Sequence, residues 1–290
     1  MNSETEITGA LELYSGKTIV VKYGGAAMRS DELRLGVIND IARLAAAGCR
    51  VVLVHGGGPE LSALQRRLGI ETKFVDGLRY TDSDTMDAAV MALCGRTNKG
   101  LVRLFENEGL RAAGLSGIDG GLLRCVKQEE PDLGYVGEIQ SVNTELIYIL
   151  LEKQYIPVVS TVGLGEDGLV YNINADTAAG RIAACVAADC FITLSDVPGV
   201  LRDVNDPLSL IEEIHTDEIE ELIGAGLISG GMIPKVRGLA AAVRGGALAA
   251  TIVDGRTKHA LLRALIARAA AEYEITFVYE SGDNGTTITG

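Results

Sequence analysis

The sequence predicts an α/β protein with a mainly parallel sheet covered by helices, and two observations carry that prediction. The first is composition: hydrophobic residues make up 47% of the 290 residues, yet aromatic residues make up only 4% and Trp is absent. A core of Ala, Val, Ile and Leu is typical of parallel strands buried on both faces. The second is the repeated alternation of short apolar runs with amphipathic helical segments, which is the pattern of β-α-β units.

The first such unit occupies residues 17–56. Residues 17–23, KTIVVKY, form an apolar strand, and residues 30–48 form a helix with acidic residues in its first turn and a glycine at its end. A second strand, residues 51–55, runs into three consecutive glycines. Pro59 then begins a helix that ends before Gly69, because proline is favoured at a helix start and glycine at a helix end.

Three glycine-rich turns join strands to helices or open a helix: Gly24-Gly25, Gly56-Gly57-Gly58 and Gly230-Gly231. Glycines leave the backbone N–H groups uncovered beside the positive end of a helix dipole, so an anion can approach closely. The alternative is a tight crossover without a ligand. None of the turns is a P-loop, because the one GK[ST] triplet, at residues 16–18, precedes a strand instead of following one.

Charged side chains stand next to these turns. Lys22 lies in the first strand just before its glycines, Lys235 follows the third turn, and Arg79 precedes a long helix that starts near Thr81. Two of them have an ordinary alternative: Lys22 could extend to reach water at the end of the strand, and Arg79 could be a surface arginine. Asp176 opens an alanine-rich helix, where it could act only as an N-cap.

The middle and the end of the chain contain further elements. Residues 112–140 hold short strand candidates separated by glycines, which suggests a hairpin-rich flap. A polar cluster at a strand-to-helix junction contains Asn172, Asn174 and Asp176. A new β-α series starts near residue 190, and residues 273–279 alternate as in a strand.

Composition also excludes some classes of function. The net charge is −13, which argues against nucleic acid or an anionic membrane surface as a partner. No apolar run approaches the ~18 residues of a membrane span, and the acidic N-terminus lacks the features of a signal peptide. The five cysteines form no CxxC pair, so we expect reduced thiols in a cytoplasmic protein and no protein-bound metal.

Several motifs together resemble the acetylglutamate kinase family of the amino acid kinase superfamily. They occur in the family's order over roughly residues 17–260: VVKYGGAAM, VVLVHGGGP, GLRYT, YNINAD, LSDVPGVL and SGGMIPKV, with GTTI at residues 285–288 as its C-terminal Gly-Thr motif. The resemblance implies a three-layer αβα sandwich with an open, mainly parallel central sheet and two lobes. We place acyl-amino-acid binding and dimer contacts in residues 1–190 and ATP binding in residues 191–290.

The resemblance also implies roles for individual residues. The catalytic residues would be Lys22, Lys235 and Asp176, with Asp176 holding both lysines. The substrate would be bound by Gly57, Gly58, Arg79, Asn172 and Asn174. The phosphoryl group and ATP would be bound by Gly24, Gly25, Ser195, Asp196, Gly199, Gly230, Gly231 and Met232.

The activity implied is ATP-dependent phosphorylation of the γ-carboxylate of N-acetyl-L-glutamate, in arginine biosynthesis, with Mg²⁺ bound through ATP. A carboxylate is already ionised at neutral pH, so the reaction needs positioning and charge stabilisation but no general base. Two alternatives stay open. One is the same chemistry on an N-acylated α-aminoadipate, since one methylene changes only pocket depth. The other is a ligand sensor without activity.

Some segments depart from the family pattern. Tyr80 stands where valine is expected, and residues 268–285 replace a shorter helix and loop. The family forms homodimers or hexamers, and some members respond to an arginine effector or a PII-type regulator. The short N-terminal segment and the altered tail leave both the oligomer and the regulation open.

Overall fold

The computed structural model describes residues 4–28, 30–75, 77–272 and 285–290. The chain folds into two compact units. The first combines residues 1–51 with residues 183–290, and the second is formed by residues 52–182. The two units are therefore not two successive halves of the chain. The assignment of substrate binding to residues 1–190 and of ATP binding to residues 191–290 remains a prediction.

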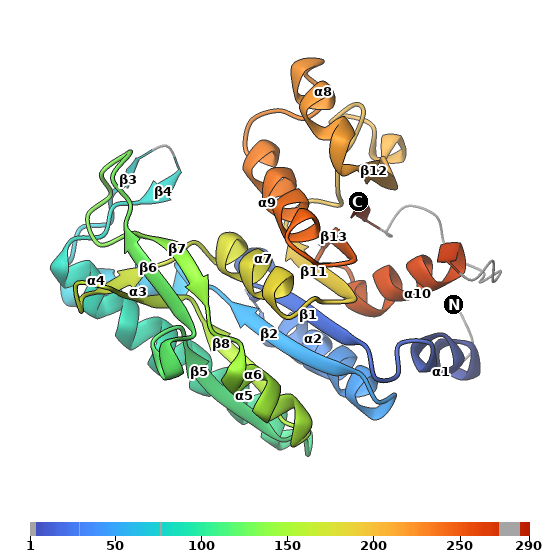
Figure 1. Cartoon of the computed structure of the whole chain (residues 1–290), viewed down its shortest axis with the longest axis horizontal. Helices are drawn as coiled ribbons and strands as arrows, with labels where there is room; N and C mark the ends of the chain where they lie inside the picture. Colours follow the sequence, from blue (N-terminus) through green and yellow to red (C-terminus); the bar gives the residue numbers. More distant parts are fainter. Residues whose placement is uncertain (1–3, 29, 76, 273–284) are drawn as a thin grey trace. The chain divides into compact units, whose positions relative to one another are not determined.

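The first unit is built on a mainly parallel sheet (Figure 1). All its neighbouring strands are parallel except for one antiparallel pair, β13 with β14. The strand residues of β11 are all buried, which explains why its sequence, CFITLS, is mostly apolar and does not alternate with charged residues. The strands in spatial order are β12 (Glu213–His215), β14 (Thr286–Thr289), β13 (Ala249–Asp254), β11 (Cys190–Ser195) and β1 (Thr18–Tyr23).

Helices cover this sheet. Helix α9 packs on β13 and β14, and α10 packs on β11 and β13, while α1 and α2 pack against α10. Helix α2 starts where the sequence predicts, because the Ser30 hydroxyl accepts a hydrogen bond from the Leu33 N–H at 3.2 Å. The helices are α1 (Glu4–Glu12), α2 (Asp31–Ala46), α8 (Ile219–Gly224), α9 (Met232–Arg244) and α10 (Ala260–Glu272), with 3₁₀ turns at Gly25–Met28, Pro207–Ser209 and Thr216–Glu218.

The second unit contains three parallel strands in the order β2 (Arg50–His55), β8 (Ile156–Ser160) and β5 (Ala112–Ser116). A separate four-stranded sheet has the order β10 (Val170–Asn172), β9 (Val162–Gly165), β6 (Leu123–Lys127) and β7 (Gly137–Val142). A short pair, β3 (Phe74–Val75) and β4 (Leu78–Arg79), is antiparallel. The helical segments are α3 (Gly58–Leu68), α4 (Ser83–Ala89), a π-helix (Val90–Thr97), α5 (Asn98–Asn107), a 3₁₀ turn (Asp119–Gly121), α6 (Glu145–Glu152) and α7 (Ala175–Cys185).

The predicted flap is only partly correct. Strands β6 and β7 do form an antiparallel pair. Residues 112–116, however, are not in the flap but form β5, which pairs in parallel with β8. Gly114 belongs to that strand because α5 lies close to it: a Cβ at this position would be 2.0 Å from the Asn98 side-chain oxygen. Close approach of a helix, and not a turn, explains this glycine.

The long helix expected from Thr81 is continuous, but its middle part, residues 90–97, is a π-helix. Asp82 caps α4 by accepting a hydrogen bond from the Thr85 N–H at 2.9 Å, and the helix continues through the π-helix into α5. A π-helical stretch is rare and is frequently found at functional sites. Here it places Leu93 and Thr97 against the glycine turn after β2.

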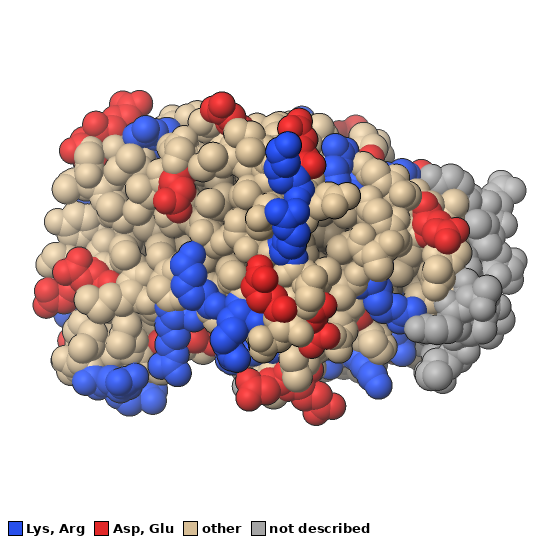
Figure 2. Space-filling view, turned by 90° about the horizontal axis from the view of Figure 1, so that it is seen from below, with Lys and Arg blue, Asp and Glu red and all other residues tan. Residues whose placement is uncertain are grey.

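The described part of the chain contains no helix long and apolar enough to cross a membrane. The predicted alternating strand at residues 273–279 lies outside the described residues. All five cysteines are free thiols, three of them buried. On the face drawn in Figure 2, acidic and basic side chains occur next to one another, so the net charge of −13 is not gathered there into one acidic patch.

Candidate active site

The glycine turn after β2 leads directly into α3. Gly57 is the N-cap of α3, Pro59 lies in its first turn, and no side chain caps the amino end of the helix. A Cβ at Gly57 would come within 2.6 Å of Leu93, whereas a Cβ at Gly58 would meet nothing within 4 Å. Packing therefore explains Gly57. Gly58 faces open space at the positive end of a helix, where an anion can be bound.

Arg79, on β4, lies over this end of α3. Its Nη2 donates to the Ser62 hydroxyl at 2.8 Å and to the Gly58 carbonyl oxygen at 3.2 Å, and its Nη1 donates to the side-chain oxygen of Gln65. The guanidinium also lies 4.9 Å from the ring centroid of Phe74. Burial lowers the pKa of Arg79, which nevertheless stays protonated at neutral pH.

All three hydrogen-bond acceptors of Arg79 are neutral. Among the described residues, no carboxylate lies within ion-pair distance of its guanidinium. A guanidinium has five N–H donors, so three hydrogen bonds leave donors for a ligand. A half-buried cation without a carboxylate partner, beside a helix amino end, is suited to binding a carboxylate through its remaining N–H donors.

The polar cluster after β10 is arranged around the start of α7. The side-chain oxygen of Asn174 accepts hydrogen bonds from the N–H groups of Asp176, at 2.9 Å, and Thr177, at 3.1 Å. Asn174, and not Asp176, is thus the residue that caps this helix. Asp176 lies half-buried in the first turn, with its carboxylate not needed as a cap. Asn172 donates to the Thr81 hydroxyl at 3.4 Å.

His55 and Asn98, which the sequence analysis did not single out, form hydrogen bonds next to the glycine turn after β2. His55 is fully buried, and its Nδ1 lies 2.8 Å from the Gly56 carbonyl oxygen. Its Nε2 lies 3.1 Å from the side-chain nitrogen of Asn98. Since an amide nitrogen can only donate, Nε2 accepts and Nδ1 carries the proton given to Gly56. Burial lowers the pKa of His55 to about 4, so this ring is neutral at pH 7.

In the first unit, the carboxyl ends of β1 and β11 meet at the same edge of the sheet. Lys22 lies half-buried opposite Thr193, close to the end of β1. Beyond it, Gly25 has a left-handed φ of +59° and a Cβ there would meet nothing within 4 Å. The structure therefore places a lysine and an open glycine turn together at this edge.

Lys235 is brought to the end of β11 from the first turn of α9. Its Nζ donates to the Ser195 hydroxyl at 2.9 Å and to the Asp196 carboxylate at 3.1 Å. The hydrogen bond from Lys235 lowers the pKa of Asp196, so this carboxylate is ionised. Three of the predicted residues, far apart in the chain, thus form one hydrogen-bonded cluster.

The remaining predicted glycines differ in what surrounds them. A Cβ at Gly199 would lie 2.5 Å from the Thr286 hydroxyl, so packing against β14 requires a glycine there. Gly230, with φ of +54°, and Gly231 have nothing within 4 Å of a Cβ, and Met232 begins α9 immediately after them. Gly230 and Gly231 therefore present bare backbone, as the prediction of a phosphate-binding turn requires.

The structure thus assembles two groups of predicted residues, one in each unit. The contact predicted between Asp176 and both lysines joins the two units and stays a prediction. Sequence reasoning missed Gln65, Ser62, His55 and Asn98. Gln65 could have been found from the sequence, because it follows Leu61 by one helical turn on the apolar face of α3. A polar side chain at such a position needs a hydrogen-bond partner.

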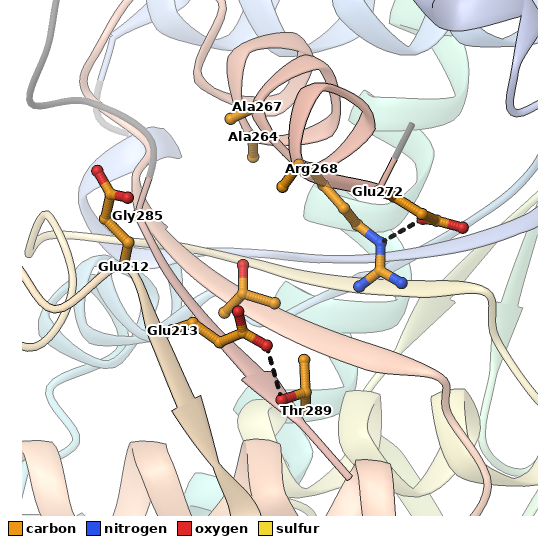
Figure 3. A pocket seen from close by; sticks show the side chains of 10 residues that line it. Glu212, Glu213, Ala264, Ala267, Arg268, Glu272, Gly285 and Thr289 are labelled. Atoms are coloured by element: carbon orange, nitrogen blue, oxygen red, sulfur yellow. Dashed lines mark hydrogen bonds and ion pairs between the residues drawn. The ribbon is translucent and has the colours of Figure 1, made fainter. Parts of the chain in front are cut away.

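The described residues contain no group of three or more His, Cys, Asp or Glu side chains placed to hold a metal ion. A cavity of about 420 Å³ lies elsewhere in the first unit (Figure 3). Arg268 pairs there with Glu272 at 3.6 Å, and Thr289 donates to Glu213 at 2.9 Å. No predicted site residue lines it; its lining is Glu212, Glu213, Ala264, Ala267, Arg268, Ala271, Glu272, Gly285, Thr287 and Thr289.

Comparison with known proteins identifies the family of this chain. The profile of the amino acid kinase family matches residues 17–254. The chain is 50% identical over 263 residues to the acetylglutamate kinase of Desulfitobacterium hafniense, covering 87% of this chain and 88% of that protein. It is 49% identical over 252 residues to the acetylglutamate kinase of Thermosynechococcus vestitus, covering 87% and 85%.

A solved structure supports the fold. N-acetylglutamate synthase from Neisseria gonorrhoeae, complexed with coenzyme A and N-acetyl-glutamate, superimposes with a TM-score of 0.80 at 21% identity, over 99% of this chain and 62% of that one. The predicted α/β fold class is confirmed. With its profile matched over most of its length and relatives near 50% identity, the chain belongs to the amino acid kinase family.

Proposed function

We propose that this protein transfers the γ-phosphoryl group of ATP to the side-chain carboxylate of N-acetyl-L-glutamate. The observation that carries the proposal is Arg79, a half-buried guanidinium with only neutral protein acceptors at the open amino end of α3. Relatives that are 45–50% identical over most of the chain are acetylglutamate kinases. N-acetyl-L-glutamate carries an α-carboxylate, so its binding site needs a cation such as Arg79.

The second unit would bind the acylated amino acid. Arg79 would pair with its α-carboxylate, and the bare N–H groups at Gly57 and Gly58 would hold the carboxylate that is phosphorylated. Asn172 would hydrogen-bond the acylamido group, since an amide side chain can both donate and accept. Asn174 would contribute its amide nitrogen, because its oxygen already caps α7.

The first unit would bind the phosphates. Lys22, with Gly24 and Gly25, would meet the phosphoryl group being transferred. Lys235, held by Ser195 and Asp196, would meet the leaving β-phosphate side. Gly230, Gly231 and Met232 would offer backbone N–H groups to the nucleotide, while Gly199 shapes the turn after β11 by packing on Thr286.

The chemistry follows from these groups. A carboxylate oxygen of the substrate forms a bond to the γ-phosphorus while the bond from that phosphorus to the bridging oxygen breaks, and ADP leaves. No proton has to move, because the attacking carboxylate is already ionised. Negative charge passes between two anions, and we propose that Lys22 and Lys235 stabilise it, with Asp176 orienting both lysines.

Mg²⁺ fits this site as a partner of ATP. Asp196 is the single carboxylate among the proposed phosphate-binding residues, and Mg²⁺ usually takes one or two protein carboxylates together with substrate phosphates. When bound, Mg²⁺ neutralises charge on the phosphates. Asp196 is the residue that would contact it or its water shell.

We also propose that the protein works in the cytoplasm as a homodimer or a hexamer. Met91, in the π-helix, and Ile149, in α6, expose 58% and 47% of their surface. Large apolar side chains exposed on a single chain are expected where a second copy covers them. Light scattering of the full chain measures the oligomer directly. A monomer at all concentrations would contradict this part of the proposal.

The Arg79→Met variant tests the proposed substrate site. Removing the guanidinium while keeping an apolar stem should raise KM for N-acetylglutamate by about 100-fold, since a charge-assisted pair to a carboxylate contributes roughly 2 to 3 kcal/mol. KM for Mg-ATP should stay within about twofold. Equal changes in both KM values, or no change in the first, would contradict the assignment of Arg79.

A further inference from the structure

Gln65 is a polar residue at a core position of α3. Its side chain is fully buried, and the residue shares the buried face of the helix with Leu61. Burying an amide is costly unless its oxygen and nitrogen find hydrogen-bond partners. Both atoms have partners here, and one of those partners is Arg79.

The Gln65 amide bridges α4 and the guanidinium. Its nitrogen donates to the hydroxyl of Thr85 at 3.0 Å, and Thr85 is itself held at the start of α4 by the Asp82 cap. Its oxygen accepts hydrogen bonds from the Thr72 hydroxyl at 3.0 Å and from Nη1 of Arg79. The amide cannot turn over without losing these bonds, so its oxygen is fixed toward Arg79.

The chemical class of this acceptor matters. A carboxylate in the same place would orient Arg79 equally well, but it would also form an ion pair and cancel the charge. An amide oxygen is neutral, and so are the Ser62 hydroxyl and the Gly58 carbonyl that hold the other guanidinium nitrogen. The shell around Arg79 thus fixes its direction and leaves its positive charge for a ligand.

We propose that Gln65 is a positioning residue for substrate binding, one that orients the guanidinium of Arg79 without neutralising it. The inference rests on the proposed function, in which Arg79 binds the α-carboxylate of the acylated amino acid. Gln65 itself touches no substrate and acts only through Arg79. The neutral side chain at position 65 is therefore a determinant of affinity for the anionic substrate.

The Gln65→Glu variant tests this inference, because it keeps the shape and the acceptor oxygen but adds a charge. KM for N-acetylglutamate should rise about tenfold or more, while kcat and KM for Mg-ATP stay within about twofold. Gln65→Met, which removes the acceptor without adding a charge, should raise the same KM by less. The matched control is Gln154→Glu, in an exposed turn before β8, which should change neither KM.

A double-mutant cycle separates positioning from a general structural effect. If Gln65 acts through Arg79, then Gln65→Glu should lower kcat/KM for N-acetylglutamate strongly in the parent and by less than about twofold in the Arg79→Met background. Equal losses in both backgrounds, or equal effects of Gln65→Glu and Gln65→Met, would overturn the inference. Thermal unfolding of each variant shows which of them fold.

Failure of the proposed function gives a different pattern. If Arg79→Met alone leaves kcat/KM unchanged while Gln65→Glu lowers it, the substrate site is wrong and this inference falls with it. If Arg79→Met lowers kcat/KM but Gln65→Glu does not, only the inference about Gln65 is wrong. If the unmodified protein neither turns over nor binds N-acetylglutamate in calorimetry, the proposed function itself is contradicted.

Discussion

Lys235 and Arg79 are both fixed by hydrogen bonds, but within the described part of the chain only Lys235 has a carboxylate partner. Asp196 lies 3.1 Å from its ammonium, whereas the acceptors around Arg79 are all neutral. The two cations are thus prepared for different tasks. Lys235 is held in place at the end of β11 beside the proposed phosphate site, and Arg79 keeps an uncompensated charge that we propose binds a carboxylate.

Replacing Lys235 with alanine should mainly slow the chemical step. The ammonium is proposed to stabilise charge that develops as the phosphoryl group leaves, and removing one such group commonly costs about 100-fold in kcat. We expect kcat of Lys235→Ala to fall by at least that factor, with KM for N-acetylglutamate nearly unchanged, in steady-state kinetics. Lys153→Ala, an exposed lysine after α6, is the control. A kcat within twofold of the parent would end this role for Lys235.

His55 makes a prediction about pH and stability. Its pKa is lowered by burial from 6.5 to about 4 in the folded protein, so between these values the unfolded chain binds more protons than the folded one. The stabilising contribution of the neutral His55 to the free energy of unfolding is fully present above pH 6.5 and is lost as the pH falls toward 4. Between pH 7 and pH 5 the loss should be about 2 kcal/mol.

The measurement is urea unfolding of the parent and of His55→Gln at both pH values. The comparison is necessary because other groups also titrate in this range. Burial raises the pKa of Asp40 to about 6, so its protonation stabilises the folded protein as the pH falls. This effect is common to both proteins and cancels in their difference. The difference between parent and variant should shrink by the stated amount at pH 5. If the two proteins lose equal stability, the imidazole is not held neutral, and NMR titration of the parent would show His55 protonating near pH 6.5.

Some of these residues could be predicted from sequence, and others could not. Lys22 and Lys235 stand next to glycine turns, so a local pattern reveals them. Asn174 shows the limit of a local pattern: the sequence offered Asp176 as the N-cap of this helix, but the side-chain oxygen of Asn174 caps α7. Gln65 acquires its role only when β4 brings Arg79 against α3, and that pairing depends on long-range contacts.

At the level of elements, the buried hydroxyl of Thr286 ties β14 to two other segments of the first unit. It accepts a hydrogen bond from the Val200 N–H at 2.8 Å and donates to the Ile211 carbonyl oxygen at 2.6 Å. Gly199 allows this close contact, because a Cβ there would lie 2.5 Å from the Thr286 hydroxyl. Gly285 instead allows close packing on β13, because a Cβ there would lie 2.3 Å from the Ile252 carbonyl oxygen. The Gly-Thr motif therefore has a structural role in holding the turn after β11.

Thr286→Val should test that role. Valine has nearly the same shape but leaves a buried N–H and a buried carbonyl without their partner, which should lower the free energy of unfolding by about 2 kcal/mol. Thr289→Val, in the same strand, removes a more exposed hydroxyl and should cost less than about 0.5 kcal/mol. Equal losses in urea unfolding would contradict the account of the motif.

Strand β5 shows why a predicted strand was placed in the wrong part of the fold. Its sequence, AAGLS, contains a glycine and no β-branched residue, so local propensity does not indicate a strand of a buried parallel sheet. Its pairing with β8 and its close contact with α5 make it a strand of the parallel sheet. Strands 51–55 and 190–195 were predicted correctly because their mostly apolar sequences, without alternating charged residues, indicate burial on both faces.

At the level of the whole molecule, the sequence predicts the α/β class but not which segments join into a unit. The prediction divides the chain near residue 190, whereas residues 1–51 fold together with residues 183–290. Connections between distant segments depend on packing, which no local pattern contains. As a result, Lys22 and Lys235 belong to one unit, and Arg79 and Asp176 belong to the other.

The measurement that tests the central claim most directly is acyl phosphate formation from Mg-ATP, trapped with hydroxylamine. N-acetyl-L-glutamate, N-acetyl-L-aminoadipate, free glutamate and free aspartate are compared in parallel, with ADP release recorded in the same samples. We predict rapid turnover only with N-acetyl-L-glutamate. Faster turnover with N-acetyl-L-aminoadipate would contradict the proposed substrate but keep the mechanism, and tight binding without turnover of any acid would contradict a kinase and favour a ligand sensor.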